Sequence, residues 1–266
     1  MNHAIELSRV TVRLAGRTLI DRIDLRAEAG RLTAVIGPNG SGKSTLLKAI
    51  CGDLQSEGAI AINGHDLRRL KPWQAAGLRA VLPQATVLSF PFTVREVVAL
   101  GASAGRPGPE ARDLEWLPER ALAEVDLDGF AGRMYGELSG GEQQRVQLAR
   151  TLCQVWSPVL DGVPRYLLLD EPVSSLDIRH QLLIMAVARR FADAGGGVIA
   201  VLHDLNLTAM FADRVLVLGG GRAAAFGTPR EVLSDGTIAQ VFSCDLRVGQ
   251  VPPAPMPFVL PQSARL

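Results

Sequence analysis

The sequence has 266 residues, and its 28 Lys and Arg side chains against 27 Asp and Glu give a formal net charge of +1. With 47% hydrophobic and 21% charged residues, the composition excludes a disordered chain, and the small net charge argues against a dedicated nucleic-acid binder. No apolar run reaches the roughly 18 residues that a membrane span needs, and we expect neither a span nor a secretory signal.

The first third of the chain alternates between apolar runs and turns. An apolar run that ends in a glycine-rich turn and is followed by helical spacing is typical of a buried strand that leads into a helix. We predict strands over 10–14, 19–25, 32–36, 59–62 and 79–82, and a helix over 45–50 that ends at Gly52.

The middle of the chain changes character. Helical spacing over 93–100 and 117–125, broken by a Pro/Gly-rich stretch at 105–109, predicts a helical insertion over 86–136. Alternation then resumes, which predicts an α/β domain with a largely parallel sheet and a proline-rich, extended end at 251–257. The predicted elements are strands over 166–169, 197–202 and 215–218, and helices over 178–191 and 205–211.

A glycine-rich motif of the form G-x-x-x-x-G-K-[ST] lies between the strand over 32–36 and the next helix. Its residues are Gly37, Pro38, Asn39, Gly40, Ser41, Gly42, Lys43 and Ser44. Glycines let successive N–H groups face one point, and the helix N-terminus adds partial positive charge there. We therefore predict a triphosphate cradle, in which Lys43 neutralises the β and γ phosphates, Ser44 holds Mg²⁺ and Thr45 adds a phosphate contact. The alternative is an ordinary glycine turn.

Two carboxylates follow the buried strand over 166–169. Asp170 at the strand end is placed to reach Mg²⁺, and Glu171 to polarise a water for in-line attack on the γ-phosphate. Two acids at the end of a buried strand are costly without a cation nearby. The alternative is a pair of solvated loop acids.

A second anion-binding turn precedes a helix that runs to about residue 153. Ser139 is placed to cap this helix, and Gly140 and Gly141 expose backbone N–H groups. Because the chain already contains a complete cradle, a second phosphate-facing turn suggests ATP held between two chains. This predicts an ATP-dependent, two-fold homodimer with two nucleotides, and the alternative is a capped helix and nothing more.

Taken together, the order of motifs closely resembles that of the ATP-binding cassette (ABC) ATPases over nearly the whole chain. The matching segments are the cradle at 37–45, Gln84, the signature at 138–143, the acidic strand end at 167–171, the loop at 174–177 and His203. The resemblance implies that Gln84 senses the γ-phosphate and Mg²⁺ and couples to a transport partner, that Asp177 shapes the dimer interface, and that His203 contacts the γ-phosphate. The alternatives are that Gln84 is an ordinary surface residue, that Asp177 only caps the next helix, and that His203 is a histidine at the edge of the core.

The resemblance also implies a fold and a division of the chain. We expect a P-loop NTPase of the ABC type, with a mostly parallel core, an antiparallel β subdomain and an inserted α-helical subdomain. The core would take 1–85 and 137–240, the helical part 86–136 and a tail 241–266. One departure is that 12–16 lacks the aromatic residue that stacks on adenine in the family; Leu14 could pack on the base or Arg13 could stack on it, and we assign no aromatic adenine contact.

The length of the helical insertion and the lack of a membrane span indicate the kind of cassette. The 55 residues from Gln84 to Ser139 leave no room for a long coiled coil, which argues against a chromosome-maintenance ATPase. We expect a separate subunit that docks onto two permease subunits and reaches the membrane through them. Phe90 and Phe92 are placed either to contact a permease helix or to fill the helical core.

Finer resemblance concerns importers of iron chelates, heme and cobalamin. The segments at 90–94 and 170–181 are similar to theirs, and the insertion at 156–165 is similar to that of hemin-importer ATPases. The resemblance implies hemin uptake with a periplasmic hemin-binding protein, at the cytoplasmic face of a bacterial inner membrane. A ferric siderophore or cobalamin importer, a soluble ATPase of cofactor assembly or DNA repair, and a non-catalytic ATP switch remain alternatives.

The remaining cysteines and histidines receive no role. The cysteines are odd in number and far apart, which favours a reducing compartment, and the histidines have no metal-ligand spacing. These residues are Cys51, Cys153, Cys244, His3, His65 and His180.

Overall fold

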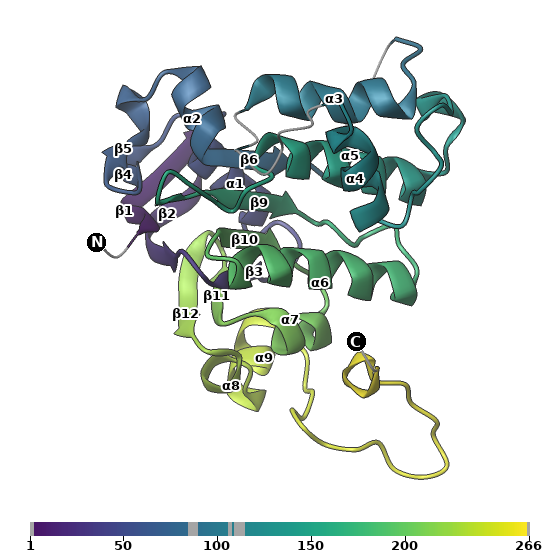
Figure 1. Ribbon diagram of the computed structural model, residues 1–266. Helices are drawn as coiled ribbons and strands as arrows, with labels where there is room; N and C mark the ends of the chain where they lie inside the picture. Colours follow the sequence, from purple (N-terminus) through teal and green to yellow (C-terminus); the bar gives the residue numbers. More distant parts are fainter. Residues whose placement is uncertain (1–2, 85–89, 106–107, 109–114, 265–266) are drawn as a thin grey trace.

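The computed structural model describes residues 3–84, 90–105, 108 and 115–264, and the expectations that fall on 86–89, 106–107 and 109–114 lie outside it (Figure 1). Within these residues, six strands form the central sheet, and neighbouring strands from β11 to β6 run parallel while β12 is antiparallel to β11. Their order is β12 (Arg222–Gly227), β11 (Arg214–Gly219), β3 (Leu32–Ile36), β10 (Gly197–Val201), β9 (Tyr166–Asp170) and β6 (Arg79–Leu82).

The central strands are buried on both faces, which explains their continuous apolar runs. In β9, Leu167 and Leu169 pack into one core, whereas Tyr166 and Leu168 pack into the other. The same alternation holds in the neighbouring strands, because successive side chains of a strand point to opposite faces. The predicted parallel sheet is confirmed.

The antiparallel subdomain lies over one face of this sheet. Its strand order is β2 (Arg17–Glu28), β1 (Ala4–Leu14), β4 (Glu57–Ile62) and β5 (His65–Asp66), and its apolar side chains share a core with helix α1 (Lys43–Cys51). Strands β1 and β2 are longer than predicted. Arg9 and Arg22 have positive φ angles at shifts in the strand register, and such bulges interrupt the alternation that sequence reasoning relies on.

Helices cover the opposite face and contribute to the larger core. They are α3 (Val94–Ala104), α4 (Leu117–Glu124), α5 (Gly140–Gln154), α6 (Ile178–Asp193) and α7 (Leu205–Phe211). Helix α3 packs closely on α5 at Gly101, where an added Cβ would lie 1.9 Å from the carbonyl oxygen of Arg150. The predicted helices over 93–100 and 117–125 correspond to α3 and α4.

Several short elements were not predicted. The periodic signals of the short helices and two-residue strands are too brief to read, because such elements depend on tertiary packing. The six-residue β12 is mostly exposed and rich in alanine, so it lacks the apolar alternation of a strand. The unpredicted elements are β5, α2 (Pro72–Leu78), the hairpin of β7 (Val159–Leu160) and β8 (Val163–Pro164), β12, α8 (Pro229–Val232), α9 (Asp235–Phe242), and the 3₁₀ turns η1 (Leu67–Arg69), η3 (Tyr135–Glu137) and η4 (Pro261–Ser263).

The C-terminal segment loops away from the body and then returns (Figure 1). Residues 243–260 contain neither helix nor strand, in agreement with the predicted extended end, and η4 then lies against α7, where Gln262 Nε2 donates to Asn206 Oδ1 at 3.0 Å. In the described part of the chain, no helix combines the length and apolar character of a membrane span.

Candidate active site

The glycine-rich motif forms the turn between β3 and α1, as predicted. Gly37 and Gly42 have φ angles of 152° and 100°, in the region that favours glycine. An added Cβ would lie 2.2 Å from the carbonyl oxygen of Leu218 at Gly37 and 2.6 Å from Cδ1 of Ile20 at Gly42. The fold therefore needs glycine at both positions to bring the backbone N–H groups round to one side.

Lys43 is folded back over this turn. Its side chain is only 6% exposed, and Nζ donates to the carbonyl oxygens of Gly37 (2.8 Å) and Pro38 (3.0 Å). Burial lowers the pKa of the Lys43 ammonium, while the carboxylates of Glu171 and Asp170 act in the opposite direction. Because both of these acceptors belong to the turn itself, the third N–H of the ammonium is suited to bind an anion.

Ser44 and Asp170 lie side by side at the ends of α1 and β9. The Ser44 hydroxyl donates to Asp170 Oδ1 at 3.0 Å, and Asp170 is 5% exposed. Burial raises the pKa of the Asp170 carboxyl, and the hydrogen bond from Ser44 opposes that shift. A hydroxyl and a carboxylate in contact offer the hard oxygen ligands that Mg²⁺ takes.

The carboxylate of Glu171 is held by two side chains from neighbouring strands. His203 Nε2 lies 2.7 Å from Glu171 Oε1, and Gln84 Nε2 donates to Glu171 Oε2 at 2.9 Å. Glu171 follows β9, His203 follows β10 and Gln84 follows β6, so the carboxyl ends of three parallel strands bring together residues far apart in sequence. This places the three predicted catalytic residues at one point.

These groups surround a cavity of about 770 Å³. In addition to the predicted residues, β2 and the turn between β11 and β12 contribute to the wall of this cavity. The sequence carried no recognisable signal for these two contributions. The lining residues are Thr18, Leu19, Asn39, Gly40, Gly42, Lys43, Ser44, Thr45, Gln84, Glu171, His203, Gly220 and Gly221.

Leu14 and Arg13, the two residues considered for contact with the base, lie outside the lining of this cavity. Arg13 forms an ion pair with Glu57 on the neighbouring strand, and Leu14 is 56% exposed. Neither residue is part of the cavity lining, whereas Thr18 and Leu19 are. The chain turns after β1, and this turn brings the start of β2 rather than the end of β1 to the cavity.

The signature turn lies outside this cavity. Ser139 caps α5: it accepts from the backbone N–H of Glu142, and both its hydroxyl (2.7 Å) and its N–H (2.8 Å) donate to the Glu142 carboxylate. These bonds lower the pKa of Glu142. An added Cβ on Gly141 would lie 3.2 Å from the side chain of Leu176, so the signature turn adjoins the loop before α6.

Asp177 also lies outside the cavity, as the N-cap of α6. Its Oδ1 accepts from the backbone N–H of His180 at 2.9 Å and lies 2.8 Å from His180 Nδ1, and these contacts lower the pKa of Asp177. His180 Nε2 is 3.4 Å from Asp126 Oδ2 at the end of α4. Sequence reasoning gave His180 no role, and the structure makes it a link between the helical insertion and the loop at Asp177.

Phe90 and Phe92 differ in their burial. Their rings form an edge-to-face pair with centroids 6.1 Å apart. Phe92 packs against the larger core, whereas Phe90 is 73% exposed.

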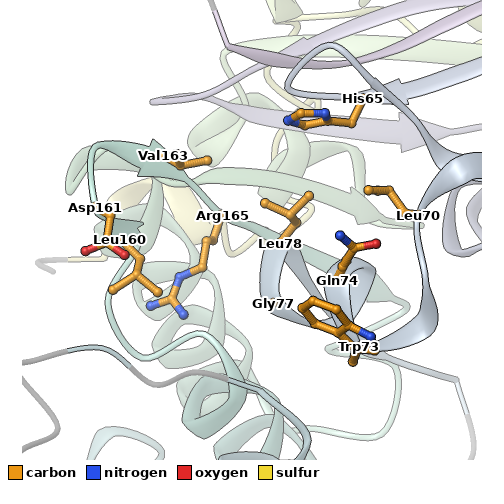
Figure 2. A pocket seen from close by; sticks show the side chains of 10 residues that line it. All are labelled: His65, Leu70, Trp73, Gln74, Gly77, Leu78, Leu160, Asp161, Val163 and Arg165. Carbon is orange, nitrogen blue, oxygen red and sulfur yellow. The ribbon is translucent and has the colours of Figure 1, made fainter.

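A second cavity of about 340 Å³ lies between α2 and the β7–β8 hairpin (Figure 2). Trp73 and Leu78 line it from α2, and Leu160 and Val163 from the hairpin. It shares no lining residue with the cavity at Lys43. The insertion at 156–165 thus builds a separate surface and does not enter the candidate active site.

Comparison with known proteins agrees with the geometry. The model of the family described as "ABC transporter" matches residues 20–174, a range that contains the glycine-rich turn, the signature turn and Glu171. Two similar curated proteins are both described as "Hemin import ATP-binding protein HmuV". The protein from Mesorhizobium japonicum is 63% identical over 98% of this chain and 99% of its own length, and that from Rhizobium meliloti is 59% identical over 98% and 100%.

Solved structures share the fold. The ATP-binding subunit of an ABC transporter superposes with a TM-score of 0.75 at 24% identity, over 86% of this chain and 91% of its own. The ADP conformation of MJ1267, an ATP-binding cassette of an ABC transporter, superposes with a TM-score of 0.75 at 22% identity, over 91% and 99%. At these identities the likeness concerns the fold alone, and it confirms the predicted architecture.

Proposed function

The chain belongs to the ABC transporter family and is an ATPase of that family, and we propose that it is the ATP-hydrolysing subunit of an importer that takes up hemin. The observation that carries the catalytic part is the arrangement at Glu171. One of its carboxylate oxygens faces His203 and the other faces Gln84, at the wall of a cavity that also contains Lys43 and Ser44. This is the composition needed to hold a triphosphate and to activate a water beside its last phosphate.

Each residue then has a task. The backbone N–H groups of 37–45 and the ammonium of Lys43 bind the phosphates, and Asn39, Gly40 and Thr45 line the same space. Glu171 acts as the general base, accepting a proton from the attacking water. His203 contacts both the base and the γ-phosphate and keeps them aligned. Gln84, which follows β6, senses the γ-phosphate and Mg²⁺.

Ser44 and Asp170, with Gln84 at the edge, would hold Mg²⁺. The donor set fits this ion, because a hydroxyl and a buried carboxylate lie 3.0 Å apart at the phosphate side of the turn. When bound, Mg²⁺ supplies positive charge that stabilises the transferring phosphoryl group.

The active form would be a homodimer. Ser139, Gly140 and Gly141 form a capped helix start that does not line the chain's own cavity, and Asp177 lies in the adjoining loop. A two-fold dimer would place this turn of one chain against the nucleotide of the other. The dimer would close on two ATP molecules and open after hydrolysis. This cycle would switch the docked partner subunits between two conformations.

The docked partners would be two permease subunits, together with a periplasmic hemin-binding protein. Phe90, 73% exposed beside the partly buried Phe92, offers an apolar contact for a permease helix. Through these partners the chain would sit at the cytoplasmic face of the bacterial inner membrane, without spanning it.

The proposed cargo rests on the relatives, since the permease and not this chain would contact it. Relatives 52–63% identical over nearly their whole length carry the hemin-import name. A ferric siderophore or cobalamin importer is the second candidate, because its ATPase would have the same site.

The experiment is reconstitution of the chain with its permease subunits in vesicles that contain the hemin-binding protein. We expect ATP turnover to rise when hemin-loaded binding protein is added, and not with a ferric siderophore or cobalamin. Stimulation by one of the other cargoes alone would reject hemin while keeping the importer. Full turnover with no stimulation by any of the three, and no association with a permease, would reject the importer.

A further inference from the structure

The backbone of Glu171 has an unusual conformation. Glu171 has a φ angle of +52°, a region that costs a residue with a side chain about 1 kcal/mol or more. This backbone turn ends β9 and directs the carboxylate toward His203 and Gln84. The conformation persists only where the surrounding structure holds it.

Hydrogen bonds hold the backbone of Glu171 on both sides. Its N–H donates to the carbonyl oxygen of Val201 on β10 at 3.2 Å. Its carbonyl oxygen accepts from the N–H of Ser174 at 3.3 Å, from Ser174 Oγ at 3.2 Å and from the side-chain amide of Gln144 at 3.0 Å. The bonds from Ser174 are local, whereas that from Gln144 comes from a different element.

Gln144 belongs to α5, the helix that Ser139 caps. It lies five residues after Ser139, and its side chain is half-buried between α5 and the end of β9. Among the described residues, its Oε1 atom is buried without a hydrogen-bond partner. The donation from Gln144 Nε2 to the Glu171 carbonyl oxygen is therefore the hydrogen bond that ties this side chain to the end of β9.

We propose that Gln144 is a positioning residue for the catalytic base. Its amide fixes the peptide of Glu171 in the left-handed turn and so fixes the direction of the carboxylate. Because Gln144 and Ser139 share one helix, the bond also connects the signature turn, which would face the partner's nucleotide, to the base that serves the chain's own nucleotide. This inference rests on the proposed role of Glu171.

Gln144→Met removes the donor while keeping the length of the side chain, and Gln144→Glu replaces the amide with a group that cannot donate when ionised. The matched control is Gln154→Met: Gln154 lies on the same helix, is half-buried, and donates to the backbone carbonyls of Ala76 and Arg79 at 2.9 Å, away from the cavity. We expect kcat to fall about tenfold in both Gln144 variants, with the affinity for a non-hydrolysable ATP analogue within about twofold of wild type. Gln154→Met should keep the wild-type kcat.

A double-mutant cycle separates positioning from general damage. If Gln144 acts through Glu171, Gln144→Met should cause no further loss in the residual single-turnover rate of Glu171→Gln. A full additional tenfold loss, or a kcat equal to wild type in Gln144→Met, would overturn the inference. If Gln144→Met unfolds at a much lower temperature than wild type, the same kcat and double-mutant measurements are made on Gln144→Glu, and their results decide. Wild-type turnover in Glu171→Gln would instead overturn the proposed base itself.

Discussion

His203 Nε2 lies 2.7 Å from Glu171 Oε1, although 32 positions separate the two residues in the sequence. The other oxygen of Glu171 accepts from Gln84 at 2.9 Å. Both oxygens of the carboxylate therefore have side-chain partners, and each partner ends a different strand. A proton acceptor held from two sides has a fixed direction, which is what in-line attack on a phosphate demands.

Replacing Glu171 with Gln tests the base directly. The amide keeps the size of the side chain but does not accept the proton of water, so we expect ATP turnover to fall about 10²- to 10⁴-fold. ATP binding should persist, so the variant should stay dimeric with ATP in size-exclusion chromatography. Phosphate release at the wild-type rate would exclude Glu171 as the base.

Lys43→Ala tests the cradle, and Lys48→Ala is its control because Lys48 lies exposed on the same helix. A charged hydrogen bond to a phosphate contributes about 1.5–3 kcal/mol, so the affinity for ATP should fall about 10- to 100-fold in Lys43→Ala. Lys48→Ala should bind as wild type does. Isothermal titration measures both constants, and equal affinities in the two variants would contradict the assignment.

Ser139→Ala separates the capping role from the proposed contact with the partner's nucleotide. Thr228→Ala is the matched control, since Thr228 and Glu231 form the same reciprocal cap on α8 as Ser139 and Glu142 on α5. Each change should lower the free energy of unfolding by about 1 kcal/mol. Only Ser139→Ala should lower turnover, by at least about tenfold. If turnover in Ser139→Ala matched that in Thr228→Ala, Ser139 would be a cap and nothing more.

Asp170→Asn should stabilise the protein in the absence of nucleotide. Burial raises the pKa of Asp170 above its ordinary value, so holding the ionised carboxylate at neutral pH lowers stability. A carboxyl whose pKa is raised in the folded protein favours folding while it is protonated at low pH. This contribution to the free energy of unfolding is lost as the pH rises through the folded-state pKa. The variant should therefore unfold at a higher temperature than wild type at pH 7.5, and the difference should shrink as the pH falls.

The same substitution should abolish the stabilisation by Mg²⁺-ATP. Asparagine removes the anionic oxygen that would hold the ion, and Ser44 alone is a weak ligand. Thermal unfolding with and without Mg²⁺-ATP measures both effects. A lower unfolding temperature in the variant without nucleotide, or an undiminished shift with it, would contradict this account of Asp170.

The three cysteines should differ in reactivity. Burial raises the pKa of both Cys51 and Cys153 to about 12, whereas Cys244 is exposed. Because the thiolate is the reactive form, a thiol reagent at pH 8 should label about one cysteine per native chain and all three after denaturation. Cys244→Ser should remove the native labelling. Rapid labelling of more than one site in the folded protein would show that a core cysteine is accessible.

Local patterns along the chain were enough to identify the candidate residues of the site. The glycine-rich turn, the acids after a buried strand and the histidine after another strand each have a local pattern, because strand ends and helix starts are fixed by neighbours along the chain. The continuous apolar run over 166–169 likewise predicted a strand buried on both faces, and the structure confirms it.

Which of these residues meet depends on the three-dimensional arrangement of the strands and helices. Gln84 and Glu171 are 87 positions apart, and the strand order that joins them cannot be read from periodicity. The same holds for Thr18 at the cavity, for the contact of Gln144 with the Glu171 peptide and for the link through His180. Such contacts depend on how sheets and helices pack, and packing is set by the whole core rather than by any one segment.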